Sequence, residues 1–140
     1  MTQYKYLKEQ QESTWLNSPF QTPKNLVGFV YEIADKENGK LYIGLTRYWS
    51  KYTLPPLKGK KNKRHFQKET KWRIYNGSGN FQELINDNPD RFVKKILRNC
   101  STITEMKCWE TYYQLNYYTN GDWDKLYNEM INLRLRIPKT

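Results

Sequence analysis

The sequence predicts one β-hairpin clearly, and this hairpin limits what the chain can fold into. Asn38-Gly39 is the strongest short-range signal for a tight turn between two antiparallel strands. Strand-forming runs flank it at residues 27–34 and 41–46, and apolar side chains alternate along both. We therefore expect this antiparallel pair to form part of a sheet.

Each strand of the hairpin carries a tyrosine, Tyr31 on the first and Tyr42 on the second. A tyrosine hydroxyl can exchange a proton with a reacting oxygen, and it can donate a hydrogen bond to a phosphate. The chain has a net charge of +10, so two such hydroxyls at one place suggest phosphodiester chemistry. Tyrosine is also a good strand former and occurs 12 times, so packing of the two rings is the plainer interpretation.

The charge balance favours nucleic acid as the partner. The chain has 24 Lys+Arg residues against 14 Asp+Glu residues, and a protein this basic most often binds a polyanion. No apolar run approaches the roughly 20 residues that span a bilayer, so we expect no membrane partner. Residues 1–8 lack an apolar signal region, so we expect the protein to stay in the cytoplasm.

Length and composition predict a single folded domain. A chain of 140 residues is long enough to bury a core. The mean hydropathy is low at -1.00, but 16% of the residues are aromatic, so we expect a core built from Trp, Tyr and Phe. Cys100 and Cys108 do not match a zinc or disulfide pattern, and we expect reduced, buried thiols. The single histidine, His65, excludes multi-histidine metal centres.

The fold class predicted for the chain is α/β in the α+β sense, with a small central three-stranded antiparallel sheet flanked by helices. Residues 92–97 alternate as the third strand. The longest helix begins after Ser101 or Thr102 and reaches about residue 118, because Thr102 and Glu105 match a capping box. We predict an N-terminal arm over 1–24, with a short helix at 4–11, and a domain over 25–140. Within the domain, the other predicted elements are a loop at 47–60, a helix that opens at 60–65 and continues toward 72, a helix at 81–86 and a short helix at 123–126.

This order of elements resembles the GIY-YIG nuclease superfamily over about residues 27–130. Tyr31-Glu32-Ile33 resembles the end of the first motif, and Tyr42-Ile43-Gly44 matches the second motif letter for letter. Lys63-Arg64-His65-Phe66 resembles the basic helix that carries the family's arginine and histidine. Glu110 takes the place of the metal-binding glutamate, and Tyr127-Asn128 resembles the late asparagine motif.

The closest subgroup in outline is the small free-standing GIY-YIG endonucleases of large phages. They share a Tyr-x-Gly-Ser-Gly string like the one that begins at Tyr75. Two departures stand out. Phe29 occupies the position of the first motif's glycine, although Gly28 is one step away. The arginine role falls to either Lys61 or Arg64, and the spacing leaves both open.

The resemblance implies roles for the individual residues. Glu110 would hold a single divalent ion, Mg²⁺ or Mn²⁺, and Tyr31 or Tyr42 would activate or orient the attacking water. Arg64 (or Lys61) and His65 would contact the scissile phosphate, and Asn128 would brace the site. The residues expected to bind DNA are Arg47, Lys58, Lys60, Lys61, Lys63, Lys71, Arg73 and Ser78.

We therefore expect a divalent-metal-dependent DNA endonuclease, of a phage homing or DNA-degrading kind. Two alternatives belong to other classes. One is a nucleic-acid-binding regulator or inhibitor that keeps the fold without catalysis, and the other is a small interaction protein with an aromatic surface. The expected DNA contacts are mostly to phosphates, which position a protein without specifying sequence. A homodimer therefore stays open as the route to tighter selectivity.

Overall fold

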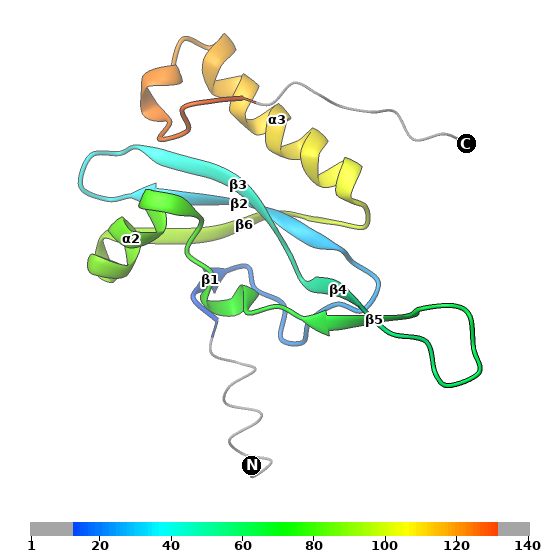
Figure 1. Cartoon of the computed structure of the whole chain (residues 1–140). Helices are drawn as coiled ribbons and strands as arrows, with labels where there is room; N and C mark the ends of the chain where they lie inside the picture. Colours follow the sequence, from blue (N-terminus) through cyan, green and yellow to red (C-terminus); the bar gives the residue numbers. More distant parts are fainter. Residues whose placement is uncertain (1–12, 132–140) are drawn as a thin grey trace.

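The computed structural model describes residues 13–131, and its centre is a four-stranded sheet with the strand order β1-β6-β2-β3. The strands are β1 (Trp15–Leu16), β2 (Gly28–Asp35), β3 (Leu41–Arg47) and β6 (Phe92–Cys100). β2 pairs antiparallel with both β3 and β6, as the alternation predicts. β1 and β3 are the two edge strands of this sheet (Figure 1).

The fourth strand corrects the predicted three-stranded antiparallel sheet. β1 pairs parallel with β6, so the sheet is mixed. β1 comes from the segment expected to be an arm, and Trp15 is only 4% exposed within the core. Residues 13–24 therefore pack as part of the fold. A strand of two residues has no periodicity to read in the sequence, which explains why it was not predicted. The short helix predicted at 4–11 lies outside the described residues.

Helices cover both faces of the sheet. α3 (Ile103–Thr119) crosses one face, and α2 (Gly79–Asp87) lies on the other (Figure 1). The helix predicted at 81–86 and the long helix predicted to reach about residue 118 are confirmed to within a few residues. Three 3₁₀ turns complete the described chain: η1 (Trp72–Ile74), η2 (Pro89–Arg91) and η3 (Trp123–Lys125). Among the described residues, no helix has the length and apolar character needed to cross a bilayer.

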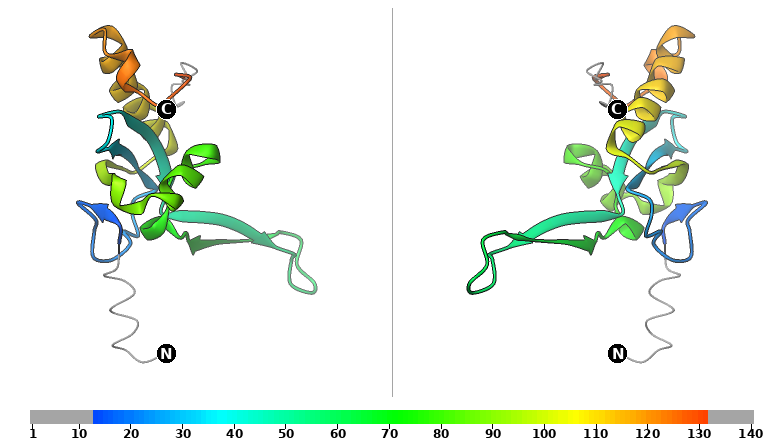
Figure 2. Two further views of the ribbon diagram at one scale, coloured as in Figure 1. Left: turned by 90° about the vertical axis from the view of Figure 1, so that its left-hand side faces the viewer. Right: turned by 90° about the vertical axis from the view of Figure 1, so that its right-hand side faces the viewer.

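A second, two-stranded sheet replaces two predicted elements. β4 (Trp49–Leu54) lies in the predicted loop, and β5 (Arg64–Glu69) lies where a helix was expected, so both predictions were wrong. The pair projects from the body of the molecule as a ribbon (Figure 2). Nearly every residue of β5 is polar and exposed, so the segment lacks the alternation that marks a half-buried strand.

The sheet separates two cores, as its alternating side chains predict. One core is largely aromatic and contains Trp15, Phe29, Tyr31 and Trp72 on the α2 face. The other lies under α3 and is mainly aliphatic, with Met106 at its centre. The expected aromatic core is therefore one of two.

The packing of α3 on the sheet depends on Gly28. A Cβ atom at this position would lie 2.2 Å from the backbone oxygen of Thr46 and 2.8 Å from the sulfur of Met106. Any side chain there would separate α3 from β2. Although Phe29 occupies the motif position, a glycine is needed one residue earlier.

The N-terminus of α3 confirms the predicted capping box with a shift of one residue. The Thr102 hydroxyl oxygen accepts from the Glu105 N–H at 3.0 Å, and the Glu105 carboxylate accepts from the Ser101 N–H at 3.0 Å. These bonds satisfy orphan backbone donors at the helix start. The two thiols differ from expectation, since Cys100 is buried but Cys108 is exposed on α3.

Candidate active site

The two hairpin tyrosines meet at the open edge of the sheet. Tyr31 pairs in register with Gly44, and the Tyr31 and Tyr42 ring centroids are 6.1 Å apart. A Cβ atom on Gly44 would lie 2.5 Å from the Tyr31 hydroxyl oxygen and 2.9 Å from the Tyr42 ring. Glycine is needed here because the Tyr31 side chain crosses the backbone of β3.

A β-bulge lies beside Tyr31. The pairing of β2 with β6 shifts between Val30 and Tyr31, which leaves Leu97 as the extra residue on β6. Bulges re-aim side chains next to functional sites.

Burial determines the protonation of both tyrosines. Tyr31 is 1% exposed, and its pKa is raised far above the ordinary value, first by burial and then by its tyrosine neighbours. Tyr42 is half-buried, and burial also raises its pKa, while a hydrogen bond from Ser78 acts in the opposite direction. Both shifts favour the protonated hydroxyl, which is able to donate a hydrogen bond.

The loop before α2 completes the tyrosine side of the site. The Tyr75 ring centroid lies 6.0 Å from that of Tyr31. Gly77 has φ +83° and its Cβ position would lie 3.8 Å from the Tyr31 hydroxyl, so the loop backbone passes close to the site. Ser78 is the N-cap residue of α2 but makes no capping bond, which leaves its hydroxyl for Tyr42.

Glu110 approaches the same place from α3. Its negative charge raises the pKa of both Tyr31 and Tyr42, so the three groups are near neighbours. Burial raises the pKa of Glu110 itself, and Lys107 partly offsets this effect. Within residues 13–131, no hydrogen bond or ion pair to the Glu110 carboxylate is formed. A half-buried carboxylate without a partner is a poor structural group and a good cation ligand.

Gln114 shows how α3 meets the sheet edge. It lies one helical turn after Glu110, and its side-chain amide donates to the Ile43 carbonyl at 3.2 Å. The same face of α3 therefore presents Glu110 to the edge strand that carries Tyr42.

The side chain of Asn128 bonds the backbone of the edge strand β3 in the way that the backbone of a further strand would. Its oxygen accepts from the Ile43 N–H at 3.0 Å, and its amide donates to the Ile43 carbonyl at 2.7 Å. The Tyr127 N–H donates to the Leu41 carbonyl at 2.8 Å. This geometry favours the bracing role expected for Asn128.

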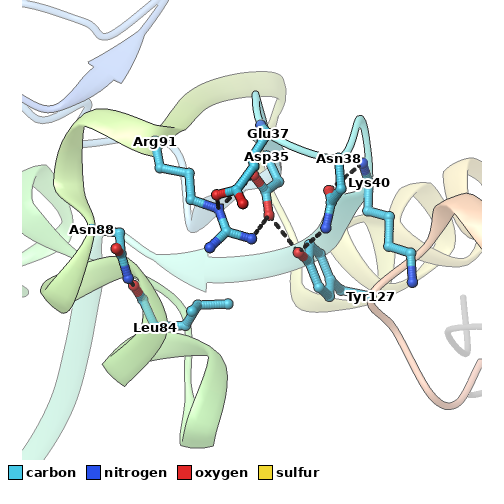
Figure 3. Close-up of polar contacts among 8 residues, drawn as sticks. All are labelled: Asp35, Glu37, Asn38, Lys40, Leu84, Asn88, Arg91 and Tyr127. Carbon is cyan, nitrogen blue, oxygen red and sulfur yellow. Dashed lines mark hydrogen bonds and ion pairs between the residues drawn. The ribbon is translucent and has the colours of Figure 1, made fainter.

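A buried carboxylate anchors the segment that carries Asn128. Asp35 is 1% exposed and accepts two hydrogen bonds from Arg91, at 2.8 and 2.7 Å (Figure 3). The Tyr127 hydroxyl also donates to Asp35, and Asn38 donates to Tyr127 at 2.7 Å. The network joins the hairpin turn to the start of β6 and to residue 127.

A buried lysine holds the loop before α2. Lys94 is 6% exposed, and its ammonium donates to the Tyr75 carbonyl, to Asn76 at 2.7 Å and to Thr14. Burial lowers the pKa of Lys94 to about 7. The three acceptors and the Trp15 ring at 4.4 Å favour the charged form.

The structure does not bring Arg64 and His65 to the tyrosines. Both lie on β5, where they pair with Leu54 and Thr53 near the distal end of the ribbon. The Arg64 guanidinium donates to the Pro55 carbonyl at 3.2 Å. The interactions that shift the pKa values of Tyr31 and Tyr42 include no cation. The predicted basic helix beside the site was therefore wrong.

Seven of the eight residues expected to bind DNA fall into three groups, and the eighth, Ser78, lies beside Tyr42. Lys58, Lys60, Lys61 and Lys63 are exposed on the turn of the ribbon. Arg47 lines a hollow at the ribbon's base, and Lys71 precedes η1. Arg73 is occupied, since it pairs with Glu69 at 2.6 Å and lies over the Trp72 ring at 4.5 Å.

Three residues of the site were not assigned roles from the sequence. Tyr75 begins the Tyr-x-Gly-Ser-Gly string that the chain shares with the small phage endonucleases, and the sequence indicated no role for its side chain. The spacing of Gln114 from Glu110 places both on one helix face. Lys94 lies between Phe92 and Ile96 on the face of β6 that is buried. A lysine at a position where the alternation predicts a buried apolar residue is the sequence signal that indicates its role.

The residues present fit a single hard cation. Within residues 13–131, no cluster of three or more His, Cys, Asp and Glu side chains could hold a metal ion. Mg²⁺ needs fewer protein ligands than that, because it keeps several waters and accepts one carboxylate together with substrate phosphate. Glu110 meets this requirement through its unpartnered, desolvated carboxylate.

A mixed sheet with two tyrosines on its edge hairpin and a facing carboxylate on a long helix defines a GIY-YIG-type nuclease domain. The chain matches the model of the family described as "Putative endonuclease segE, GIY-YIG domain" over residues 9–131, and it belongs to this family. No curated protein and no solved structure matches the chain.

Proposed function

We propose that this protein is a divalent-metal-dependent DNA endonuclease that hydrolyses phosphodiester bonds at the site of Tyr31, Tyr42 and Glu110. The observation that carries the proposal is the unpartnered Glu110 carboxylate, close enough to both tyrosines to raise their pKa values. The match to a family of endonuclease domains supports DNA as the substrate.

In this proposal Glu110 holds Mg²⁺ or Mn²⁺ together with a phosphate oxygen. When bound, the ion neutralises charge on the phosphate and lowers the pKa of a coordinated water. The protonated Tyr42 hydroxyl donates a hydrogen bond to a phosphate oxygen or orients the attacking water. Tyr31 fixes the Tyr42 ring from the buried side. Ser78 donates to Tyr42 and orients its hydroxyl.

A role in phage homing or in DNA degradation belongs to the same proposal and rests on the resemblance to small phage endonucleases. So does homodimer formation, which would bring two such sites to one duplex.

Incubation with supercoiled plasmid DNA tests the proposal. With Mg²⁺ or Mn²⁺ we expect nicked or linear product, and with excess EDTA we expect none. Glu110→Gln is the matched control, because it keeps the shape of the side chain and removes the charge that holds a cation. Failure of the wild-type protein to cut in any of these metals would contradict the proposal.

A second candidate is a DNA-binding regulator that has lost catalysis. The observation that favours it is that the two candidates for the phosphate contacts, Arg64 and His65, lie on the β4–β5 ribbon and not beside the two tyrosines. The same plasmid experiment separates the two candidates when binding is measured in parallel. Binding that is unaffected by Mg²⁺ and by Glu110→Gln, with no cleavage, would favour the regulator.

A further inference from the structure

The β4–β5 ribbon concentrates the positive charge of the molecule. The ribbon, residues 49–69, contains seven Lys and Arg residues and one acidic residue, Glu69, which pairs with Arg73 at its base. Among the described residues, none of these seven cations takes part in an ion pair. A projecting element with this charge repels itself unless a polyanion binds it.

The tip of the ribbon is built as a defined turn. The Lys60 N–H donates to the Leu57 carbonyl at 2.8 Å, and Gly59 supplies the positive φ of +83° that this turn requires. The tip therefore presents its lysines from a compact loop. These lysines are Lys58, Lys60, Lys61 and Lys63.

The two faces of the ribbon differ in chemistry. On one face, Tyr52 stacks on Phe66 with ring centroids 5.5 Å apart, and both rings remain exposed. This cross-strand pair stabilises a two-stranded ribbon that would otherwise be marginal. On the other face the register places two polar pairs side by side: Lys51 opposite Gln67, and Thr53 opposite His65.

The polar face carries side chains of the types that can read base edges. A glutamine can bond adenine bidentately, a lysine can bond the guanine acceptors, and a threonine methyl can contact thymine. All four residues line one open hollow on the ribbon, together with Tyr52 and Phe66 of the aromatic pair. Lys51 and Gln67 also line a second hollow with Arg47 and the N-terminal turn of α3, so the polar face continues onto the body toward the helix that carries Glu110.

The size of the ribbon matches a groove of duplex DNA. Six residues per strand at about 3.3 Å per residue give a length of about 20 Å. The major groove of B-form DNA is about 12 Å wide and admits a two-stranded ribbon, whereas the minor groove is about half as wide.

We propose that the β4–β5 ribbon enters the major groove of duplex DNA, with Lys51, Thr53, His65 and Gln67 toward the bases and the tip lysines on the phosphates. This inference rests on the proposed function for its substrate. It assigns His65 to DNA binding on the ribbon, away from the tyrosine site.

Salt-dependent binding tests the phosphate contacts. The probe is a 30-base-pair duplex taken from a plasmid site that the wild type cuts, or from random plasmid sequence if it cuts none. We expect Lys60→Ala with Lys61→Ala to reduce the slope of log affinity against log salt by about 2. The matched control is Lys36→Ala with Lys40→Ala, which removes the same charge from the hairpin turn at the other end of β2. We expect this control to change the slope by less than about half a unit.

Base reading is tested with Thr53→Ala and Gln67→Ala. We expect Gln67→Ala to reduce the preference for one base pair about 5- to 150-fold, and Thr53→Ala to reduce the preference for another by a smaller factor, while the salt slope stays unchanged in both. The measurement is sequencing of cut ends, or selection of bound duplexes from a random pool when cleavage is absent. Circular dichroism shows whether each variant keeps its fold.

The outcomes separate this inference from the proposed function. If the tip variant and the control variant lose the same amount of salt slope, the proposed role of the ribbon is overturned, because net charge alone would then explain the binding. Tighter binding to single strands than to duplex would also overturn it. Intact cleavage with unchanged specificity in the ribbon variants would leave the proposed function standing and this inference refuted. If DNA binding depends on the ribbon but the wild type cleaves no DNA, this inference stands and the proposed function is refuted.

Discussion

At the scale of single residues, the site depends on how closely two tyrosine rings and one glycine fit together. Tyr31 is buried and Tyr42 is half-buried, and burial raises both pKa values above the ordinary value for tyrosine, which already keeps the hydroxyl protonated at neutral pH. We therefore propose hydrogen-bond donation, and not proton abstraction, as the role of the tyrosines. Two substitutions test that distinction.

We expect Tyr42→Phe to lower the cleavage rate about 10²- to 10³-fold, which is the usual effect of removing one donor from a developing charge. The hydroxyl is lost while the ring remains. Tyr31→Phe should also slow cleavage, but less, because its hydroxyl is the more deeply buried. Single-turnover kinetics with saturating enzyme measure both variants. A near-normal rate in both would assign the tyrosines to packing alone.

Gly44→Ala should lower both stability and activity. The new methyl group would overlap the Tyr31 hydroxyl, at 2.5 Å, so the ring must move. Overpacking of this kind costs about 1–3 kcal/mol in the free energy of unfolding. Thermal denaturation measures the loss. In the double variant with Tyr31→Phe the two losses should be less than additive, and strict additivity would show that the two residues do not interact.

At the scale of elements, long-range contacts hold each piece of the site. Lys94 on β6 binds the loop that leads to Ser78, and Asn128 and Gln114 both bind Ile43 on β3. Two side chains distant in sequence, Gln114 and Asn128, therefore hold the β3 strand of the hairpin.

We expect Lys94→Met to destabilise the protein by about 1–3 kcal/mol, since it leaves the Tyr75 carbonyl and the Asn76 side chain without their donor. The methionine keeps the packing of the stem on Trp15. Cleavage should also slow because the loop that carries Ser78 loses its anchor. Chemical denaturation measures the stability. Lys95→Met is the matched control on the same strand, where the side chain is exposed, and an equal loss in both would refute this role.

At the scale of the whole molecule, Asp35 joins three distant segments and makes stability depend on pH. The Arg91 guanidinium holds the pKa of Asp35 well below its usual range, with further hydrogen bonds from Tyr127 and the Glu37 N–H. A carboxyl with a depressed folded pKa adds stability above its unfolded pKa of about 3.9, and this stability is lost as the pH falls toward the folded value.

We therefore expect the wild type to lose stability steeply below about pH 4. Asp35→Asn should show a flatter pH dependence and a loss of about 1–3 kcal/mol at neutral pH, because the buried donors lose their acceptor. Melting temperatures measured from pH 7 to pH 2 test this. Parallel curves for the two proteins would show that Asp35 does not carry the acid sensitivity.

Several features could be predicted from local sequence. The hairpin follows from Asn38-Gly39 and the alternation on each side, and α3 follows from the Thr102 cap and apolar residues at helical spacing. The closeness of Tyr31 and Tyr42 follows from their places on the two strands of this hairpin. In each case the signal lies within a few residues along the chain or across one tight turn, where backbone geometry alone relates them.

The sequence by itself therefore determined the hairpin, the long helix and the residues they carry. Tertiary structure alone decided that Trp15 adds a parallel strand, that Lys94 binds the loop before α2, and that β4 pairs with β5 to carry Arg64 and His65 away from the tyrosines. The physical reason is that strand pairing and burial depend on contacts between residues distant along the chain. Thr14 and Lys94, for example, are separated by 80 positions, and no local pattern records their contact.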